Sequence, residues 1–144
     1  MKFLLSLLCS LSLATSALAA GTHVKGQKPL SISQGAAVNL ADFLVPGKVT
    51  IFDFTSEYCP PCRAYAEPLY ILHANSPGIV VVKIDINRPE IHRIDWDSPV
   101  AREFDLHSIP HFKVYGPDGR LVAEDTTDDR PARALVNKWL SAVQ

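Results

Sequence analysis

The sequence lacks a surplus of charge, internal repeats and low-complexity segments, and these absences narrow the functions open to it. It carries 14 Lys and Arg against 15 Asp and Glu, a formal net charge of -1. A chain without a basic surplus or a run of like charge is not expected to bind nucleic acid or an anionic membrane surface. A hydrophobic fraction of 47% over 144 residues is enough for the core of one domain and argues against disorder.

The longest hydrophobic stretch lies at the N-terminus and is typical of an export signal. Lys2 precedes an apolar stretch over residues 3–14 that only serines interrupt, and Ala17-Leu18-Ala19 has the small residues of a cleavage site. We therefore predict a cleaved signal peptide over residues 1–20 and a mature domain over residues 21–144 in a periplasmic or secreted protein. An uncleaved anchor is the alternative, because the stretch is just long enough to span a bilayer.

Cysteine is scarce, and loss of the signal peptide would make it scarcer. The chain has three cysteines, and removal of Cys9 would leave only the pair in Cys59-Pro60-Pro61-Cys62. A structural cross-link over so short a loop restrains the unfolded chain very little. Redox chemistry or metal binding explains the pair better, since this spacing is also half of a zinc site.

Two near-continuous apolar runs, Val49–Thr55 and Ile79–Asp85, predict strands buried on both faces. The segment Pro60–Asn75 between them predicts a helix, so the two strands should be parallel. The predicted fold class is α/β, a mixed central sheet with helices on both faces. Weaker patterns predict a strand over 30–33, short helices over 38–44 and 100–106, an antiparallel hairpin of 112–115 and 121–123 around the turn 116–119, and a last helix from Pro131.

The cysteine pair falls where the first core strand ends and the helix begins. A thiol at this position meets the positive end of the helix dipole, which favours the reactive thiolate. We expect Cys59, at the cap position, to be the more exposed and to attack a substrate disulfide. Cys62, one turn later, should be shielded and resolve the mixed disulfide. Because Pro60 and Pro61 have no N–H, the N–H of Cys62 remains as a donor to the Cys59 sulfur.

These segments resemble the thioredoxin family. Asp53-Phe54 and Tyr58-Cys59-Pro60-Pro61-Cys62-Arg63 are similar to its strand end and active-site motif, Ser108-Ile109-Pro110 to its cis-proline loop, and residues 116–119 to its hairpin turn. The resemblance runs from about Ala36 to the C-terminus. With the export signal, the chain is similar to the periplasmic thioredoxin-like branch of this family. It implies a thioredoxin fold and a thiol–disulfide oxidoreductase of the protein-disulfide reductase type that uses no cofactor and no metal.

The resemblance also assigns roles to single residues. It implies that Asp53 is a buried acid that assists proton removal from Cys62 and that Lys83 is its partner, although Lys83 can also be a strand-edge charge in solvent. Burial should raise the pKa of the Asp53 carboxyl. The catalytic set is then Cys59, Cys62, Asp53 and Lys83. Substrate would contact Tyr58, Pro60, Pro61 and the backbone of Ile109, which precedes a cis Pro110.

The sequence departs from the family pattern near this site. Tyr58 stands where tryptophan usually precedes the first cysteine, and a Pro-Pro dipeptide replaces Gly-Pro. An insertion that includes residues 88–97 lengthens the chain before Pro110. We interpret Trp96 in this insertion as an anchor of the loop, with a substrate wall as the alternative. We interpret His111 as an ordinary polar residue entering a strand, with a position near the sulfurs as the alternative.

The resemblance also bears on the direction of electron flow. Ile109 before the cis-proline resembles reducing thioredoxins, so we expect a reductant of protein disulfides that receives electrons from a membrane-embedded dithiol donor. A disulfide donor or isomerase remains open. A copper-binding module that uses Cys59, Cys62 and His111 is a second class, and a redox-inert interaction domain is a third. The sequence gives no sign of oligomerisation, and we assume a monomer.

Overall fold

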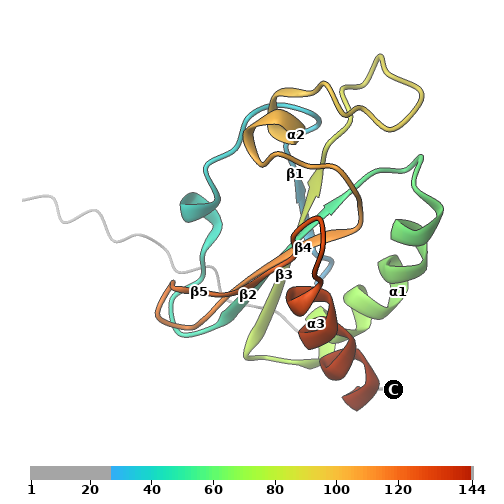
Figure 1. Ribbon diagram of the computed structural model, residues 1–144. Coiled ribbons are helices and arrows are strands. Elements are labelled where there is room, and N and C mark those ends of the chain that lie inside the picture. The colour runs from blue at the N-terminus through green and yellow to red at the C-terminus, as the bar shows by residue number, and fades with distance from the viewer. Residues whose placement is uncertain (1–26, 144) are drawn as a thin grey trace, which may run out of the picture.

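Strands β2 (Val49–Thr55) and β3 (Ile79–Asp85) form the centre of the sheet, as their apolar runs predict. They pair in parallel over their full length, and residues 49 and 55 lie opposite residues 79 and 85. Helix α1 (Pro60–Asn75) makes the crossover between them (Figure 1). The predicted bounds of all three elements are confirmed.

The computed structural model describes residues 27–143, so the predicted signal peptide lies outside the described residues. Strand β1 (Leu30–Ile32) pairs in parallel with β3, β4 (His111–Tyr115) pairs antiparallel with β2, and β5 (Leu121–Glu124) pairs antiparallel with β4. The sheet order is β1-β3-β2-β4-β5. The sheet is therefore mixed, and the predicted hairpin is confirmed. Within residues 27–143 no helix has the length and apolar character needed to cross a bilayer.

Two short helices differ from their predicted bounds because of their caps. The segment expected over 38–44 is a 3-10 helix, η1 (Leu40–Phe43), which starts after Asn39 accepts the N–H of Ala41. The segment expected over 100–106 is α2 (Pro99–Glu103), which starts at Pro99 after Ser98 accepts the N–H of Ala101. It ends early because the chain turns to a positive φ of 48° at Asp105. The apolar pattern predicted the positions of both helices but not their ends.

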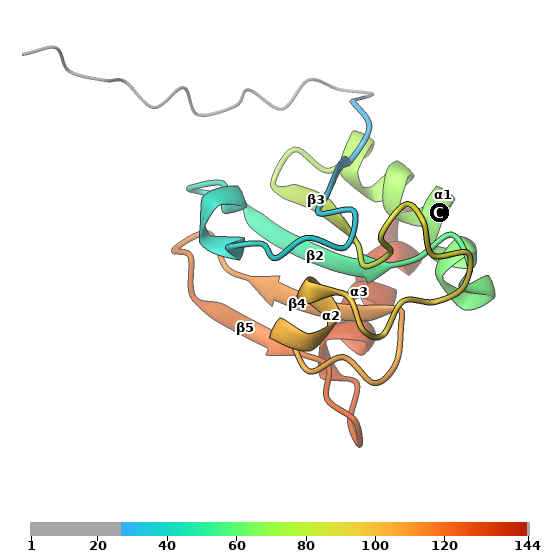
Figure 2. The same ribbon diagram turned by 90° about the horizontal axis from the view of Figure 1, so that it is seen from above.

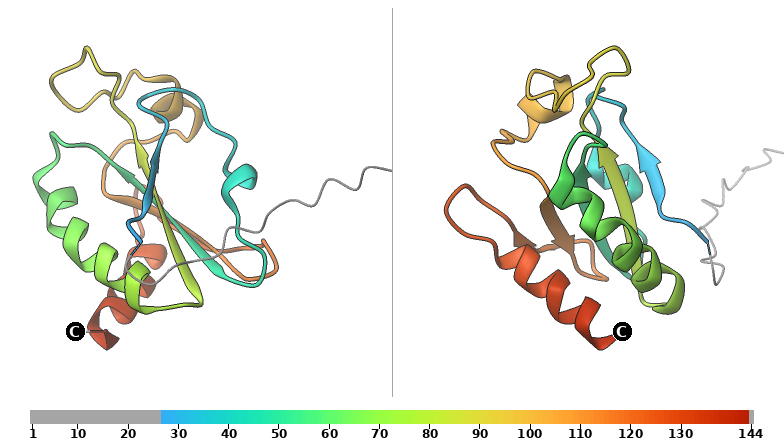
Figure 3. Two further views of the ribbon diagram at one scale, coloured as in Figure 1. Left: turned by 180° about the vertical axis from the view of Figure 1, so that it is seen from behind. Right: turned by 90° about the vertical axis from the view of Figure 1, so that its right-hand side faces the viewer.

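The two faces of the sheet bury separate cores. Helices α1 and α3 (Pro131–Ala142) pack together on one face, and η1 and α2 lie on the other (Figures 2 and 3). Side chains alternate along β2, so Ile51 faces the α1–α3 side while Phe52 and Phe54 face the α2 side. The cysteine pair belongs to the α2-side core.

The insertion before the cis-proline loop is closed by an ion pair. The Arg88 guanidinium donates through Nε and Nη2 to both oxygens of Asp95, at 2.7 and 2.9 Å. The Asp95 side chain is 3% exposed, and the Arg88 hydrogen bonds hold the pKa of its carboxyl below the usual value. Trp96 next to it is 39% exposed, so Asp95 and not Trp96 is the buried residue at this point of the loop. Asp95 anchors this loop, because a bidentate pair fixes a side chain in both position and orientation.

Gly35 lies in the loop between β1 and η1, where this loop contacts the insertion. We expect that its replacement lowers the stability of the fold. Gly35 has a φ of +80°, and a Cβ there would lie 2.7 Å from the backbone nitrogen of Arg88. We expect Gly35→Ala to lower the free energy of unfolding by about 2–4 kcal/mol, because left-handed strain adds to the clash. Urea denaturation would measure it.

Two further glycines distinguish the cost of the left-handed backbone from the cost of the clash with Arg88. Gly47 has a φ of +78° but open space around it, so Gly47→Ala should cost only about 1–2 kcal/mol. Gly78 has open space and no positive φ, so Gly78→Ala should be neutral or stabilise by up to about 1 kcal/mol. Equal costs for Gly35→Ala and Gly47→Ala would show that the contact with Arg88 contributes nothing.

Candidate active site

The first turn of α1 is capped by a sulfur. Cys59 and Cys62 form a disulfide with an S–S distance of 2.02 Å, and Cys59 is the N-cap residue of α1. The N–H of Cys62 donates to the Cys59 Sγ at 3.1 Å. The prediction that this N–H remains as a donor after the two prolines is confirmed. A helix N-terminus aimed at a sulfur in this way stabilises negative charge on it.

The predicted difference in exposure between the two cysteines is wrong for this disulfide form. Cys59 is 1% exposed and Cys62 is 3% exposed, so both are buried. The cis-proline loop lies against Cys59, whose Sγ is 3.7 Å from the carbonyl oxygen of Ile109. The adjacent Pro60 and Pro61 are exposed, while Tyr58 is partly buried. A substrate therefore meets the two prolines before it reaches the sulfur.

The loop before β4 presents the second part of the site. The Ile109–Pro110 peptide bond is cis, as the resemblance implied. Both residues are buried, and Ile109 packs in the same core as the two cysteines. The structure thus brings together residues about 50 positions apart in the sequence, because β4 pairs directly with β2, whose end leads to Cys59.

Asp53 is a buried acid in the centre of the sheet. It is 1% exposed, and its Oδ1 has no hydrogen-bond partner among the described residues. Burial raises the pKa of its carboxyl to about 7, and the positive charge of Lys83 opposes that rise. Lys83 lies directly opposite Asp53 on β3, so the predicted neighbour relation is confirmed. A carboxyl that titrates near neutral pH is suited to accept and return a proton.

Two salt-bridging residues that the sequence did not single out hold the cis-proline loop. Asp125 follows β5, is 1% exposed, and accepts the backbone N–H of Phe112 and of Arg133. The Arg133 guanidinium of α3 in turn donates to the carbonyl oxygen of Pro110. These bonds fix the loop to the start of α3. No sequence signal marked these residues, since isolated Asp and Arg side chains are usually on the surface.

A second network ties the segment before Cys59 to the insertion. The Ser56 hydroxyl donates to the Asn87 side-chain oxygen at 2.7 Å and accepts the N–H of Tyr58. The Tyr58 hydroxyl lies 3.1 Å from Nδ1 of His92, so the residue in place of the family's tryptophan contacts the insertion. The insertion therefore contacts, through His92, the residue directly before Cys59.

His111 lies on the α2 side of the sheet. It is 8% exposed, its ring packs edge-on against Phe54 at 5.6 Å between centroids, and its Nε2 has no partner among the described residues. The interpretation of His111 as an ordinary polar residue is therefore incomplete, because it is buried. Within residues 27–143 no three His, Cys, Asp or Glu side chains converge as metal ligands. The geometry thus offers no support for copper bound by Cys59, Cys62 and His111.

This geometry defines a protein that exchanges thiols for disulfides. A sulfur that a helix N-terminus stabilises as thiolate can attack a disulfide of another protein. A second cysteine in the same turn can then form the intramolecular disulfide and release that protein. The thioredoxin family model matches residues 38–141, and the chain belongs to the thioredoxin family. It is accordingly a thiol–disulfide oxidoreductase with the cysteine pair 59 and 62 as its redox centre.

Curated relatives and solved structures agree with this assignment. The chain is 30% identical over 96 residues to a thioredoxin of Streptomyces clavuligerus, covering 67% of this chain and 80% of the relative. It is 30% identical over 102 residues to a thiol:disulfide interchange protein TxlA homolog of Synechocystis, covering 69% of this chain and 52% of that protein. A mutant thioredoxin of Halobacterium salinarum superposes with a TM-score of 0.55 at 21% identity, covering 86% of this chain and 97% of that one, and supports the fold.

Proposed function

We propose that this protein is an exported reductant of protein disulfides. The observation that carries the proposal is the Cys62 N–H bonded to the Cys59 sulfur beside the Ile109 carbonyl, because it combines a stabilised attacking sulfur with a backbone acceptor for a substrate strand. The N-terminal sequence supports export to the periplasm or the exterior. Electrons would come from a membrane-embedded dithiol donor, since an exported reductant is separated from cytoplasmic reductases.

The reaction would proceed in two exchanges. The Cys59 thiolate attacks one sulfur of the substrate disulfide, the substrate S–S bond breaks, and the other substrate sulfur leaves as thiolate. The Cys62 thiol loses its proton to Asp53, and the Cys62 thiolate attacks the Cys59 sulfur. This step forms the Cys59–Cys62 disulfide and releases the second substrate thiolate. Two electrons pass from the cysteine pair to the substrate. Of the two protons that the substrate thiolates take up, one is the Cys62 proton returned by Asp53, and the other comes from solvent, which received it when Cys59 ionised.

The equilibrium reduction potential of the Cys59–Cys62 couple tests the direction. Titration of residues 21–144 in redox buffers of known potential, followed by thiol labelling, would measure it. A value near that of thioredoxin, about -270 mV, would support a reductant. A value near about -120 mV would overturn the proposal in favour of a disulfide donor or isomerase.

Export is tested separately, by cell fractionation with sequencing of the mature N-terminus. A protein that keeps residues 1–20 and stays in the cytoplasm would contradict export.

A further inference from the structure

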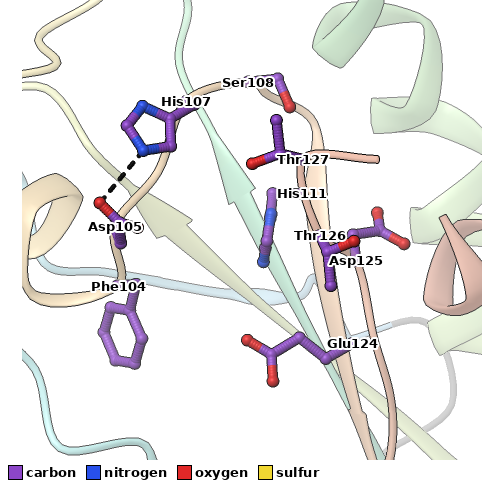
Figure 4. Close-up of a pocket in the computed structure, with 9 residues that line it drawn as sticks. All are labelled: Phe104, Asp105, His107, Ser108, His111, Glu124, Asp125, Thr126 and Thr127. Atoms are coloured by element: carbon purple, nitrogen blue, oxygen red, sulfur yellow. Dashed lines mark ion pairs between the residues drawn. The ribbon is translucent and has the colours of Figure 1, made fainter. Parts of the chain in front are cut away.

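A pocket of about 220 Å³ lies beside the cis-proline loop, on the face of the sheet that carries α2. The α2–β4 loop, including Asp105 and Ser108, forms one wall, and the end of β5 with the loop after it forms the other (Figure 4). Ser108 is one residue before Ile109, whose carbonyl lies beside the Cys59 sulfur. The pocket is therefore next to the site described above but contains neither cysteine.

The floor of this pocket holds a buried polar atom without a partner. The ring of His111 lies among the lining side chains in Figure 4, and its Nε2 makes no hydrogen bond within the described residues. Burial lowers the pKa of this imidazole, the charge of Asp125 opposes that effect, and the charge of Lys113 adds to it. A neutral imidazole has one nitrogen that accepts a hydrogen bond. A buried polar atom without a partner costs free energy, which a bound donor would recover.

The remaining lining side chains are mostly acceptors of hydrogen bonds. They include three carboxylates and three hydroxyls, those of Asp105, Glu124, Asp125, Ser108, Thr126 and Thr127. Among the described residues that line the pocket there is no lysine or arginine. A group with several N–H donors and a positive charge would match this lining, since charge-assisted hydrogen bonds are the strong ones.

Neighbouring cations balance only part of this negative charge. Lys113 lies 2.6 Å from Glu124, and Arg133 Nε lies 3.9 Å from Asp125. Asp105, at the mouth, has a side chain that is 91% exposed, and its Oδ1 lies 3.1 Å from Nε2 of His107. Arg130 donates to the Ser108 hydroxyl but also accompanies two further acids in the same loop, at positions 128 and 129. Four of the six residues over 124–129 are acidic, so the local charge stays negative.

We propose that this pocket is a specificity subsite for a basic side chain, lysine or arginine, of the substrate polypeptide near the attacked disulfide. The proposal rests on the proposed function, because the substrate strand must lie along Ile109 for a nearby side chain to enter. A volume of about 220 Å³ is below the range of about 300–1,000 Å³ typical of small-molecule sites, and suits one side chain. The three donors of a lysine ammonium match Nε2 of His111, a pocket carboxylate and a hydroxyl.

The test compares peptides that differ at one side chain. Short peptides with a central cysteine, held as a mixed disulfide with thionitrobenzoate, carry lysine, arginine, norleucine or glutamate at each flanking position in turn. The reduced full-length domain, residues 21–144, reacts with each, and chromophore release gives the second-order rate constant. At one flanking position we expect the lysine peptide to react about tenfold faster than the norleucine peptide, and the glutamate peptide to be the slowest.

Variants locate the preference. Asp105→Asn removes a surface carboxylate at the mouth, and His111→Phe removes the buried acceptor but keeps an aromatic ring against Phe54. Both should bring the lysine-to-norleucine ratio close to one. Asp118→Asn removes the same charge in the β4–β5 turn and should keep the ratio of the parent protein. Because the ratio is internal to each variant, a general loss of activity cancels, and Asp105→Asn remains informative if His111→Phe fails to fold.

The outcomes that would overturn the proposal are distinct from failure of the proposed function. A ratio near one at every position in the parent, or a preference that survives Asp105→Asn and His111→Phe, would overturn the subsite. Loss of the preference in Asp118→Asn as well would assign it to overall charge and would also overturn it. No reaction with the norleucine peptides would instead count against disulfide reduction itself.

Discussion

Replacing Cys59 with serine will abolish turnover of protein disulfides, by at least about three orders of magnitude, as deletion of a nucleophile does in other enzymes. The Cys59 sulfur is the atom that the N–H of Cys62 faces, at 3.1 Å, and a serine hydroxyl is not ionised at neutral pH. The measurement is the rate at which the reduced variant cleaves a protein disulfide under conditions where the parent turns over. Retained turnover in Cys59→Ser would show that attack does not begin at this sulfur.

The matched variant Cys62→Ser separates attack from resolution. It keeps the attacking sulfur but removes the thiol that releases the substrate, so a mixed disulfide through Cys59 should accumulate. Non-reducing gel electrophoresis and mass spectrometry of the trapped peptide would identify the bond. A mixed disulfide that forms through Cys62 in Cys59→Ser, but never through Cys59 in Cys62→Ser, would reverse the assigned order.

Asp53→Asn will change the pH dependence of stability and of the resolving step. The pKa of Asp53 rises from 3.8 to about 7 on folding, so the folded protein holds a proton that the unfolded chain releases. The contribution of Asp53 to the free energy of unfolding is fully present below pH 3.8. It falls as the pH rises and is lost above about pH 7. At 1.36 kcal/mol per pKa unit the loss is about 4 kcal/mol, and Asp53→Asn should remove most of this slope. Urea denaturation of the oxidised protein across this range would measure it.

The kinetic part of this prediction concerns the proton of Cys62. Without a carboxyl to accept it, we expect resolution of the mixed disulfide near neutral pH to slow by about a hundredfold. Lys83→Met is the informative partner variant. The charge of Lys83 lowers the pKa of Asp53, so its loss should raise that pKa and extend the falling part of the stability curve to higher pH. Equal pH slopes in the parent and in Asp53→Asn would show that Asp53 does not titrate in this range.

The strongest sequence signals predicted the central sheet and the cysteine geometry correctly. The runs Val49–Thr55 and Ile79–Asp85 are buried on both faces of the sheet. A near-continuous apolar run of this length indicates a central strand, so the sequence predicted both correctly. The two prolines of the motif likewise left the Cys62 N–H as a donor to Cys59. Cis geometry at Pro110 came from family resemblance, because a sequence alone does not distinguish the two isomers.

The hydrogen bonds that hold the cis-proline loop could not be predicted from the sequence, because they join segments that are far apart along the chain. Asp125 accepts N–H groups from β4 and α3, and Arg133 reaches the Pro110 carbonyl, yet neither residue stands in a recognisable motif. The hydrophobicity of Trp96 suggested that this residue anchors the insertion, whereas the buried residue there is its neighbour Asp95. The equal burial of Cys59 and Cys62 depends on how the cis-proline loop packs, which is a tertiary feature without a local signal.

The cap of α1 has a consequence for the energetics of the whole domain. The atom that caps this helix is the same sulfur that gains or loses a bond in each catalytic cycle. Oxidised and reduced protein, each folded or unfolded, therefore form a closed thermodynamic cycle. Any difference in unfolding free energy between the two forms must equal, after multiplication by two Faraday constants, the difference in reduction potential between the folded and the unfolded cysteine pair. The tendency of this protein to give up electrons is thus, in part, a property of how well its first helix is held together.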